Sequence, residues 1–138
     1  MRRPIHHDRG NGVDFGWRQM RRIQITAAAI RGYAELTGDL APIHLQAEAA
    51  RQAGYQAPIA HGMYLMGVAQ SIYLEEHRTH WIPSYNMKFH RPLVQDTLAC
   101  FVYEACGDSI QVTIREQDEA GEIIAKGAFI VREGVCSL

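Results

Sequence analysis

Segment 62–76, GMYLMGVAQSIYLEE, restricts the possible folds of this chain more than any other feature of its sequence. The segment has the length of one helix, begins at His61 or Gly62, and is apolar on nearly every side until its last turn. A helix that lacks a polar face has to be covered by the rest of the protein. The sequence therefore predicts a buried central helix, and the remaining elements must provide its cover.

Strand-like and helix-like segments on either side of this helix show what covers it. Before it we expect a strand over 17–26, a helix over 27–38 with Thr26 as its N-cap and Gly38 as its stop, and an Ala-rich helix over 44–54. After Pro83, four β-rich segments follow at 84–93, 96–106, 109–118 and 122–131, and turn residues (107–108 and 119–121) separate the last three.

This order of elements predicts an α+β fold, because strands follow one another without alternating helices. One antiparallel sheet wrapped around a long central helix is the hot-dog arrangement. Residues 17–138 are expected to form this single domain, and residues 1–16, which are polar and aperiodic, a flexible N-terminal tail.

Charge and composition argue against several classes of partner. The 138 residues carry a formal net charge of −1, so neither nucleic acid nor a membrane surface is an expected partner. The basic cluster Arg18, Arg21 and Arg22 is interpreted as a solvated strand face. No apolar run reaches the ~18–20 residues of a membrane-spanning helix. No apolar segment follows the basic N-terminal residues, so no secretory signal is expected.

The cysteines and most histidines are not expected to carry chemistry. Three cysteines (Cys100, Cys106 and Cys136) are an odd number without metal-type spacing, which favours reduced thiols and a cytoplasmic location. His6 and His7 lie in the predicted tail. His77 and His80 are interpreted as partners of a helix C-terminus, and Glu75 and Glu76 as solvated.

The segment TGDLAPIHLQ, residues 37–46, is a polar break between two helix-like stretches and holds Asp39 and His44. A neutral imidazole can accept a proton from water, and a nearby carboxyl group can orient it or act as a second proton carrier. The alternative is that Asp39 only caps the following turn.

A second candidate element is AHGM, residues 60–63, at the start of the buried helix. The first N–H groups of a helix lack partners within the helix and favour negative charge. A glycine there lets a substrate oxygen approach the backbone, so Gly62 with His61 and Met63 could form an oxyanion or substrate-binding site. The alternative is a tight entry into the helix where glycine only relieves crowding.

Two stretches resemble a known family. AELTGDLAPIHLQAEAARQAGYQAPIAHGM is similar to the hydratase-2 motif of MaoC-like enzymes and (R)-specific enoyl-CoA hydratases. MKFHRPLVQDTL resembles the strand of that family which reads Phe-x-Arg-Pro-Val…Gly-Asp. The family pattern reads Gly-Asp-x-Asn-Pro-x-His, then His-Gly-Met about sixteen residues later. The likeness extends over roughly residues 25–131.

The resemblance implies a hot-dog homodimer that reversibly hydrates trans-2-enoyl thioesters to (3R)-3-hydroxyacyl thioesters at the subunit interface. Asp39 and His44 match the catalytic aspartate and histidine, and Gly62 matches the glycine whose N–H binds the thioester carbonyl. No metal or redox cofactor is implied, because coenzyme A or acyl carrier protein enters as part of the substrate.

This chain departs from the family pattern at Ala41, which replaces the asparagine, and at Gln46-Ala47, which replaces a frequent Asp-Pro. Loss of an N-cap side chain usually costs ~0.5–2 kcal/mol, so the loop that holds Asp39 and His44 is expected to be less firmly fixed. Bulky residues of the central helix (Tyr64, Met66 and Tyr73) either shorten the acyl pocket or pack in the core.

Two other functions fit the same residues. A hot-dog thioesterase would release free thiol from the thioester instead of adding water. A non-catalytic acyl-thioester-binding or partner subunit would bind without turnover, and substitutions at Asp39 or His44 would then change nothing. Enoyl-thioester hydration is the leading prediction.

Overall fold

The computed structural model describes residues 16–134. The predicted tail, apart from Gly16, lies outside the described residues, as do His6, His7 and Cys136. Among the described residues, no helix combines the length and hydropathy needed to cross a lipid bilayer.

Five strands form one antiparallel sheet in the order β1-β3-β4-β5-β2. They are β1 (Arg18–Ile25), β2 (His80–Phe89), β3 (Thr97–Cys106), β4 (Ser109–Glu116) and β5 (Ile123–Glu133). The first strand pairs with the third along its whole length, from Arg18 opposite Glu104 to Ile25 opposite Thr97. β1 and β2 are therefore the two edges of the sheet, although they lie on opposite sides of the central helix in the chain.

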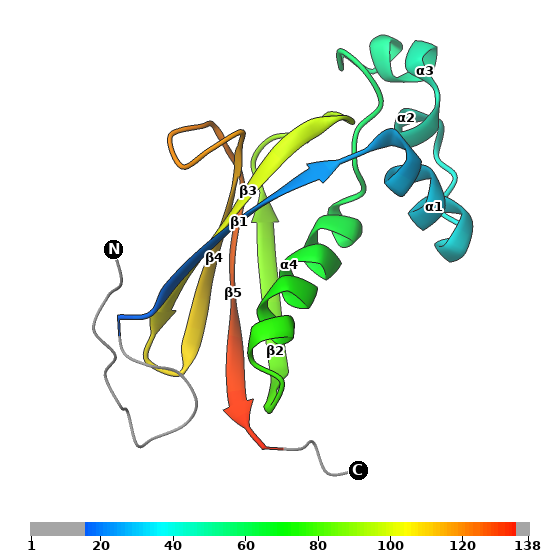
Figure 1. The fold of residues 1–138 in the computed structure, drawn as a ribbon. Coiled ribbons are helices and arrows are strands. Elements are labelled where there is room, and N and C mark those ends of the chain that lie inside the picture. Colours follow the sequence, from blue (N-terminus) through cyan, green and yellow to red (C-terminus); the bar gives the residue numbers. More distant parts are fainter. Residues whose placement is uncertain (1–15, 135–138) are drawn as a thin grey trace.

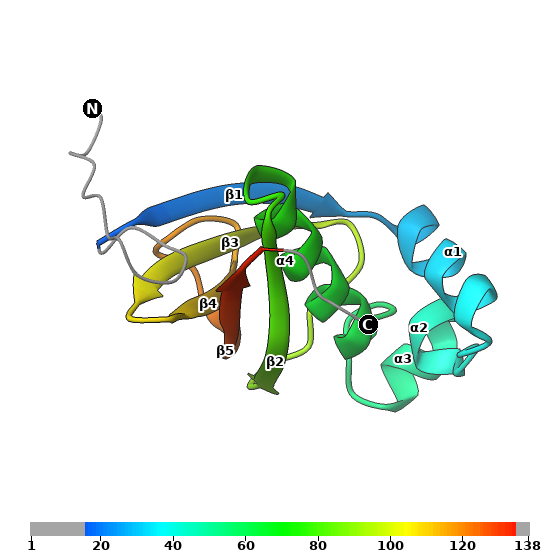
Figure 2. The same ribbon diagram turned by 90° about the horizontal axis from the view of Figure 1, so that it is seen from below.

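The central helix, α4 (Gly62–Glu76), lies against the inner face of the curved sheet (Figure 1, Figure 2). Its buried residues Leu65, Ala69 and Ile72 belong to one core cluster with residues of β1, β3, β4 and β5. The predicted helix and its bounds are confirmed, but within the described residues only its face towards the sheet is buried, and Met63 on another side is 66% exposed. Three shorter helices, α1 (Ala27–Thr37), α2 (Pro42–Leu45) and α3 (Ala47–Gln52), lie beyond one end of the sheet (Figure 1).

Helix α1 begins and ends where its capping residues predict. The Thr26 hydroxyl accepts a hydrogen bond from the N–H of Ala29, at 3.0 Å. Gly38 takes the left-handed conformation, with φ of 79°, and its N–H donates to the carbonyl of Ala34. Both ends therefore follow from local chemistry, and this stop turns the chain into the segment that holds Asp39.

Two predicted elements differ from the structure. The Ala-rich helix over 44–54 is interrupted at Gln46, which has extended backbone angles and separates α2 from α3. The strand predicted over 84–93 spans 80–89 instead. It begins before Pro83 because a register irregularity between Trp81 and Ser84 accommodates the proline, which lies on an edge strand where a missing N–H is tolerated. It ends at Phe89 because the next two N–H groups both donate to the carbonyl of Ile124.

The predicted surface features are found on β1 and β3. Arg21 forms an ion pair with Glu75, at 3.5 Å, and Arg18 forms one with Glu104, at 3.7 Å. The two acids are more than half exposed and the two arginines somewhat over one third. Cys100 and Cys106 are free thiols, so these two cysteines are not linked to each other. The arginines of β1 therefore reach solvent, as predicted, but they do not share one face: Arg21 lies on the side of α4, and Arg18 and Arg22 lie on the opposite side.

Candidate active site

Asp39 lies directly after the left-handed turn at Gly38, on the segment between α1 and α2. Its side chain is 54% exposed. The contacts within its own segment are long, 3.4 Å from its N–H to the hydroxyl of Thr37 and 3.5 Å from its carboxylate to the N–H of Ala41. The carboxylate is therefore open to a substrate, and the segment that carries it is loosely bonded within itself.

His44 lies in α2, which starts at Pro42 and has no side-chain cap. Its Nδ1–H donates to the backbone carbonyl of Ile59, at 2.7 Å. Because a carbonyl only accepts, this bond requires the proton on Nδ1 and leaves the lone pair on Nε2. His44 is therefore held in the tautomer that can accept a proton through Nε2.

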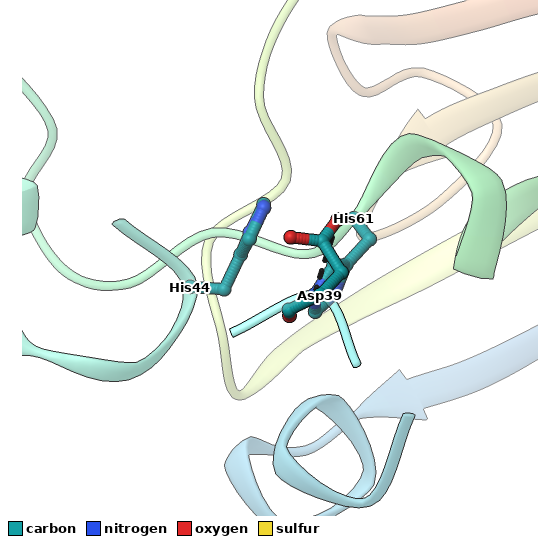
Figure 3. Close-up of side chains that lie close together, drawn as sticks. All are labelled: Asp39, His44 and His61. Atoms are coloured by element: carbon teal, nitrogen blue, oxygen red, sulfur yellow. Dashed lines mark hydrogen bonds and ion pairs between the residues drawn. The ribbon is translucent and has the colours of Figure 1, made fainter. Parts of the chain in front are cut away.

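His61 lies beneath these two residues and is 3% exposed. Its Nε2–H donates to the backbone carbonyl of Asp39, at 3.0 Å, and the same nitrogen lies 4.0 Å from the Asp39 carboxylate. Its ring stacks on that of His44, with centroids 3.7 Å apart and planes 21° apart (Figure 3). The structure thus brings Asp39, His44 and His61 together. His61 is the buried member of the three and contacts both of the others.

Gly62 is the first residue of α4, and the preceding His61 provides no side-chain cap. A Cβ atom at Gly62 would lie 3.2 Å from Cε1 of Phe89, so the ring at the end of β2 packs directly on the glycine. Phe89 belongs to the segment MKFHRPLVQDTL that resembles the family, but its contact with Gly62 was not predicted, because only the pairing of β2 brings the ring to this helix start. Met63, the next residue, is 66% exposed and does not pack in the core.

A cavity of about 310 Å³ adjoins Gly62. Its lining is mainly apolar and includes Tyr55, Ile59, Leu65 and Phe89. A larger cavity, of about 740 Å³, lies around Arg91, Arg115 and Lys126, and neither cavity is lined by Asp39 or His44. We place the candidate site at the smaller cavity because Gly62 lines it, begins α4 and directly follows His61, which contacts Asp39 and His44.

The spacing of Asp39, His44 and His61 resembles that of metal ligands, since one donor atom of each lies within 4.8 Å of the others. Their orientation does not suit a metal. A metal ion lies close to the plane of each imidazole that binds it, about 2.0–2.1 Å from the nitrogen. Rings stacked 3.7 Å apart and 21° from parallel cannot both meet that condition, so the residues present do not fit a metal ion.

A second cluster of polar side chains, which the sequence did not predict, lies at the other end of α4. His80 lies on β2, bonds the Tyr73 hydroxyl at 2.7 Å through Nδ1, and pairs with Glu133 at 2.9 Å through Nε2. His77 stacks on the Tyr73 ring with centroids 4.0 Å apart. The prediction that His80 serves the helix C-terminus is therefore wrong, because β2 begins earlier than expected and buries it.

The bulky residues of α4 have structural contacts. Tyr73 is fully buried in the core, and this burial raises the pKa of its phenol. Tyr64 contacts Tyr33 of α1, with ring centroids 5.3 Å apart. The backbone carbonyl of Met66 accepts a hydrogen bond from Tyr85. Core packing therefore explains Tyr73, and none of the three lines the cavity beside Gly62.

Known proteins similar to this chain share its fold and part of its sequence. A stretch of 60 residues is 32% identical to 3-hydroxybutyryl-CoA dehydratase of Methylorubrum extorquens and covers 44% of this chain and 38% of that protein. The chain thus matches well under half the length of this relative.

Solved structures extend the likeness over the whole fold. An (R)-hydratase from A. caviae involved in PHA biosynthesis superposes with a TM-score of 0.77 at 18% identity, covering 90% of this chain and 99% of that chain. A chain of the ChsH1–ChsH2 complex from Mycobacterium tuberculosis superposes with a TM-score of 0.71 at 15% identity, covering 86% and 97%. These similarities confirm the predicted hot-dog fold.

A family model described as a MaoC like domain matches residues 10–126. The matched range contains α1 to α4, β1 to β4 and the polar segment between α1 and α2. Since it covers well over half of the sequence, this chain belongs to the MaoC-like domain family, as its motifs predict.

Proposed function

We propose that this protein catalyses the reversible hydration of trans-2-enoyl thioesters to (3R)-3-hydroxyacyl thioesters. The observation that carries the proposal is the tautomer of His44: its Nδ1–H is engaged by the Ile59 carbonyl, so Nε2 is free to accept a proton beside the exposed Asp39 carboxylate. The family assignment and the names of the dehydratase and hydratase similar to this chain support the same reaction class.

The proposed reaction starts with a water molecule between His44 and Asp39. His44 Nε2 accepts a proton from this water as its oxygen bonds to Cβ of the enoyl group. The N–H of Gly62, at the positive end of α4, stabilises the enolate oxygen that develops on the thioester. The Asp39 carboxylate accepts a hydrogen bond from the other hydrogen of the water and holds the water in place, and His44 Nε2 then passes the proton it took to Cα, so that Cα gains one proton and Cβ one hydroxyl group. Because both residues lie on one side of the site, the two additions are syn.

The substrate is proposed to carry its acyl group on coenzyme A or acyl carrier protein, with no further cofactor. We also propose a homodimer with the site at its interface. Apolar side chains around the site support this, since Leu36, Leu40 and Met63 are each more than half exposed. A cytoplasmic location stays a prediction of the sequence.

The test follows enoyl absorbance of crotonyl-CoA in the presence of the wild-type protein, Asp39→Asn and His44→Ala. We expect absorbance to fall only with the wild type, without release of free thiol. Each substitution should lower kcat/KM at least 100-fold, within the range that general acid–base residues contribute. Asp108→Asn, at an exposed turn acid that pairs with Arg132, is the matched control and should react like the wild type.

Other outcomes separate the alternatives. Release of free thiol with the enoyl group intact would indicate a thioesterase. Binding of the thioester without turnover, unchanged by Asp39→Asn or His44→Ala, would indicate the non-catalytic subunit and contradict the proposal.

A further inference from the structure

The segment that holds Asp39 is weakly fixed by its own residues. Ala41, at the N-cap position of α2, has no side chain that could accept a hydrogen bond from the first turn. The two local contacts of Asp39, at 3.4 and 3.5 Å, are at the long limit for hydrogen bonds. Catalysis by a positioned carboxylate therefore needs support from another part of the chain.

The buried side chain of His61 contacts both Asp39 and His44. Its Nε2–H bond to the Asp39 carbonyl, at 3.0 Å, is shorter than either contact within the segment. Its ring covers that of His44, and on another side the ring of Tyr33 lies edge-on with centroids 4.8 Å apart. One buried ring therefore touches Asp39 through a hydrogen bond and His44 through stacking.

We propose that His61 is a positioning residue that sets the relative placement of Asp39 and His44, a role that rests on the proposed hydration. This differs from the substrate-binding role that the sequence suggests. A buried ring whose Nε2 is already bonded acts on the reaction through its two neighbours and not through the substrate.

The unpaired nitrogen of His61 supports this role. Its Nδ1 is buried and has no hydrogen-bond partner among the described residues. A buried polar atom without a partner costs about 1–3 kcal/mol, and an apolar side chain at this position would avoid that cost. The hydrogen bond from Nε2 to the Asp39 carbonyl is the interaction that a histidine makes here and an apolar residue cannot.

Two substitutions separate the two contacts. His61→Phe keeps a flat ring under His44 and removes the hydrogen bond to Asp39. His61→Gln keeps an N–H donor at a similar reach and removes the stacked ring. With crotonyl-CoA we expect each variant to lose about 10- to 100-fold in kcat, as small misplacements of catalytic groups do, with KM within twofold of the wild type.

His77→Gln is the matched control, because it also removes a stacked histidine whose N–H donates to a backbone carbonyl, at the opposite end of α4. It should lower Tm and leave kcat unchanged. If the His61 variants lose kcat only as much as His77→Gln does, or if KM rises and kcat stays, the proposal is overturned.

Ala41→Asn offers a rescue that a merely structural role does not predict. An asparagine at this N-cap fixes the Asp39 segment by a second route. In the His61→Phe background we expect it to restore kcat at least threefold, and in the wild-type background to change kcat less than twofold. Equal effects in both backgrounds would contradict the proposal.

A measurement without turnover distinguishes failure of this inference from failure of the proposed function. The ring nitrogens of His44, observed by 15N NMR, should show a single tautomer protonated at Nδ1 in the wild type. They should show a mixture in His61→Gln, because without the stacked ring the imidazole can turn away from the Ile59 carbonyl that fixes its tautomer. If the wild type hydrates no enoyl thioester, the proposed function fails, and this spectrum still decides the role of His61. An identical spectrum in both proteins would overturn it.

Discussion

At the scale of single residues, Gly62 is the first residue of α4 and packs against the ring of Phe89. It begins α4, and a Cβ atom there would lie 3.2 and 3.3 Å from two atoms of the Phe89 ring. Contacts of this length require the neighbour to move by a few tenths of an ångström. The absence of a side chain therefore serves the packing of Phe89 as well as the approach of a substrate oxygen to the backbone.

Gly62→Ala is expected to lower kcat/KM for crotonyl-CoA between about 10-fold and 1000-fold, because the methyl group displaces Phe89 and obstructs the oxyanion donor. Tm should change little, since the better helix propensity of alanine, up to about 1 kcal/mol, offsets the crowding. Gly32→Ala on α1 is the control: its Cβ meets no atom within 4 Å, so it should raise Tm and leave kcat/KM unchanged. Unchanged kcat/KM in Gly62→Ala would contradict the assigned role.

Asp39, His44 and Gly62 could be proposed from the sequence because each belongs to a short motif with a chemical meaning, and their roles stay predictions. The contact of Phe89 with Gly62 and the stack of His61 on His44 were not predicted. Both contacts are made by residues that are far apart in the chain, and no local pattern encodes them. The histidine–histidine stack joins α2 to the residue before α4, so it depends on how that intervening loop folds back.

At the scale of elements, α2 is the least supported helix of the site. It has four residues, starts with Pro42 and ends at Leu45, because the backbone is extended at Gln46. Its attachment comes from tertiary bonds, since Ile59 N–H donates to the Ile43 carbonyl and His44 bonds the Ile59 carbonyl. The segment around Ile59, which forms an isolated bridge with Val94, thus substitutes for the missing cap.

Ala41→Asn should raise the free energy of unfolding by about 1 kcal/mol, because it supplies the N-cap that α2 lacks. For a protein of this size the expected rise in Tm is a few degrees. Calorimetry of the wild type and the variant measures it. Ala28→Asn, an exposed position inside α1, is the control and should lower Tm, because asparagine is a poorer helix former than alanine. An equal or lower Tm for Ala41→Asn would show that α2 needs no cap.

Elements with local start and stop signals were predicted well, and the others were not. The cap at Thr26, the stop at Gly38 and the apolar run of α4 are local, so α1 and α4 were predicted with their bounds. The break at Gln46 and the start of β2 at His80 depend on tertiary partners. β2 extends back to His80 because β5 continues to Glu133 opposite it, and nothing near Pro83 signals this.

At the scale of the whole molecule, tyrosines attach the apolar helix α4 to the sheet. The Tyr103 hydroxyl of β3 donates to the carbonyl of Ala69, at 2.8 Å, and the Tyr85 hydroxyl of β2 donates to that of Met66, at 2.7 Å. These bonds fix an otherwise apolar helix in one position, which hydrophobic contacts alone specify less well. They lie between the candidate active site at one end of α4 and the Tyr73–His80 pair at the other.

The group at the far end of α4 is expected to make stability depend on pH in two ranges. Burial lowers the pKa of His77 below its usual value, against opposing contributions that include its bond to the Tyr73 carbonyl and the charges of Glu76 and Glu133. The hydrogen bond from Thr79 lowers the pKa of Glu133. In both cases the unfolded chain takes up its proton at a higher pH than the folded protein does.

Stability should therefore fall as pH decreases, first below about 6.5 as unfolded His77 is protonated, then below about 4.3 as unfolded Glu133 is protonated. Urea unfolding from pH 8 to pH 3.5 measures both ranges. His77→Gln should flatten the first decline and Glu133→Gln the second, each without removing the other. Equal slopes for His77→Gln and the wild type between pH 7.5 and 5.5 would show that this histidine is solvated in the folded protein, and that the far end of α4 is open to water.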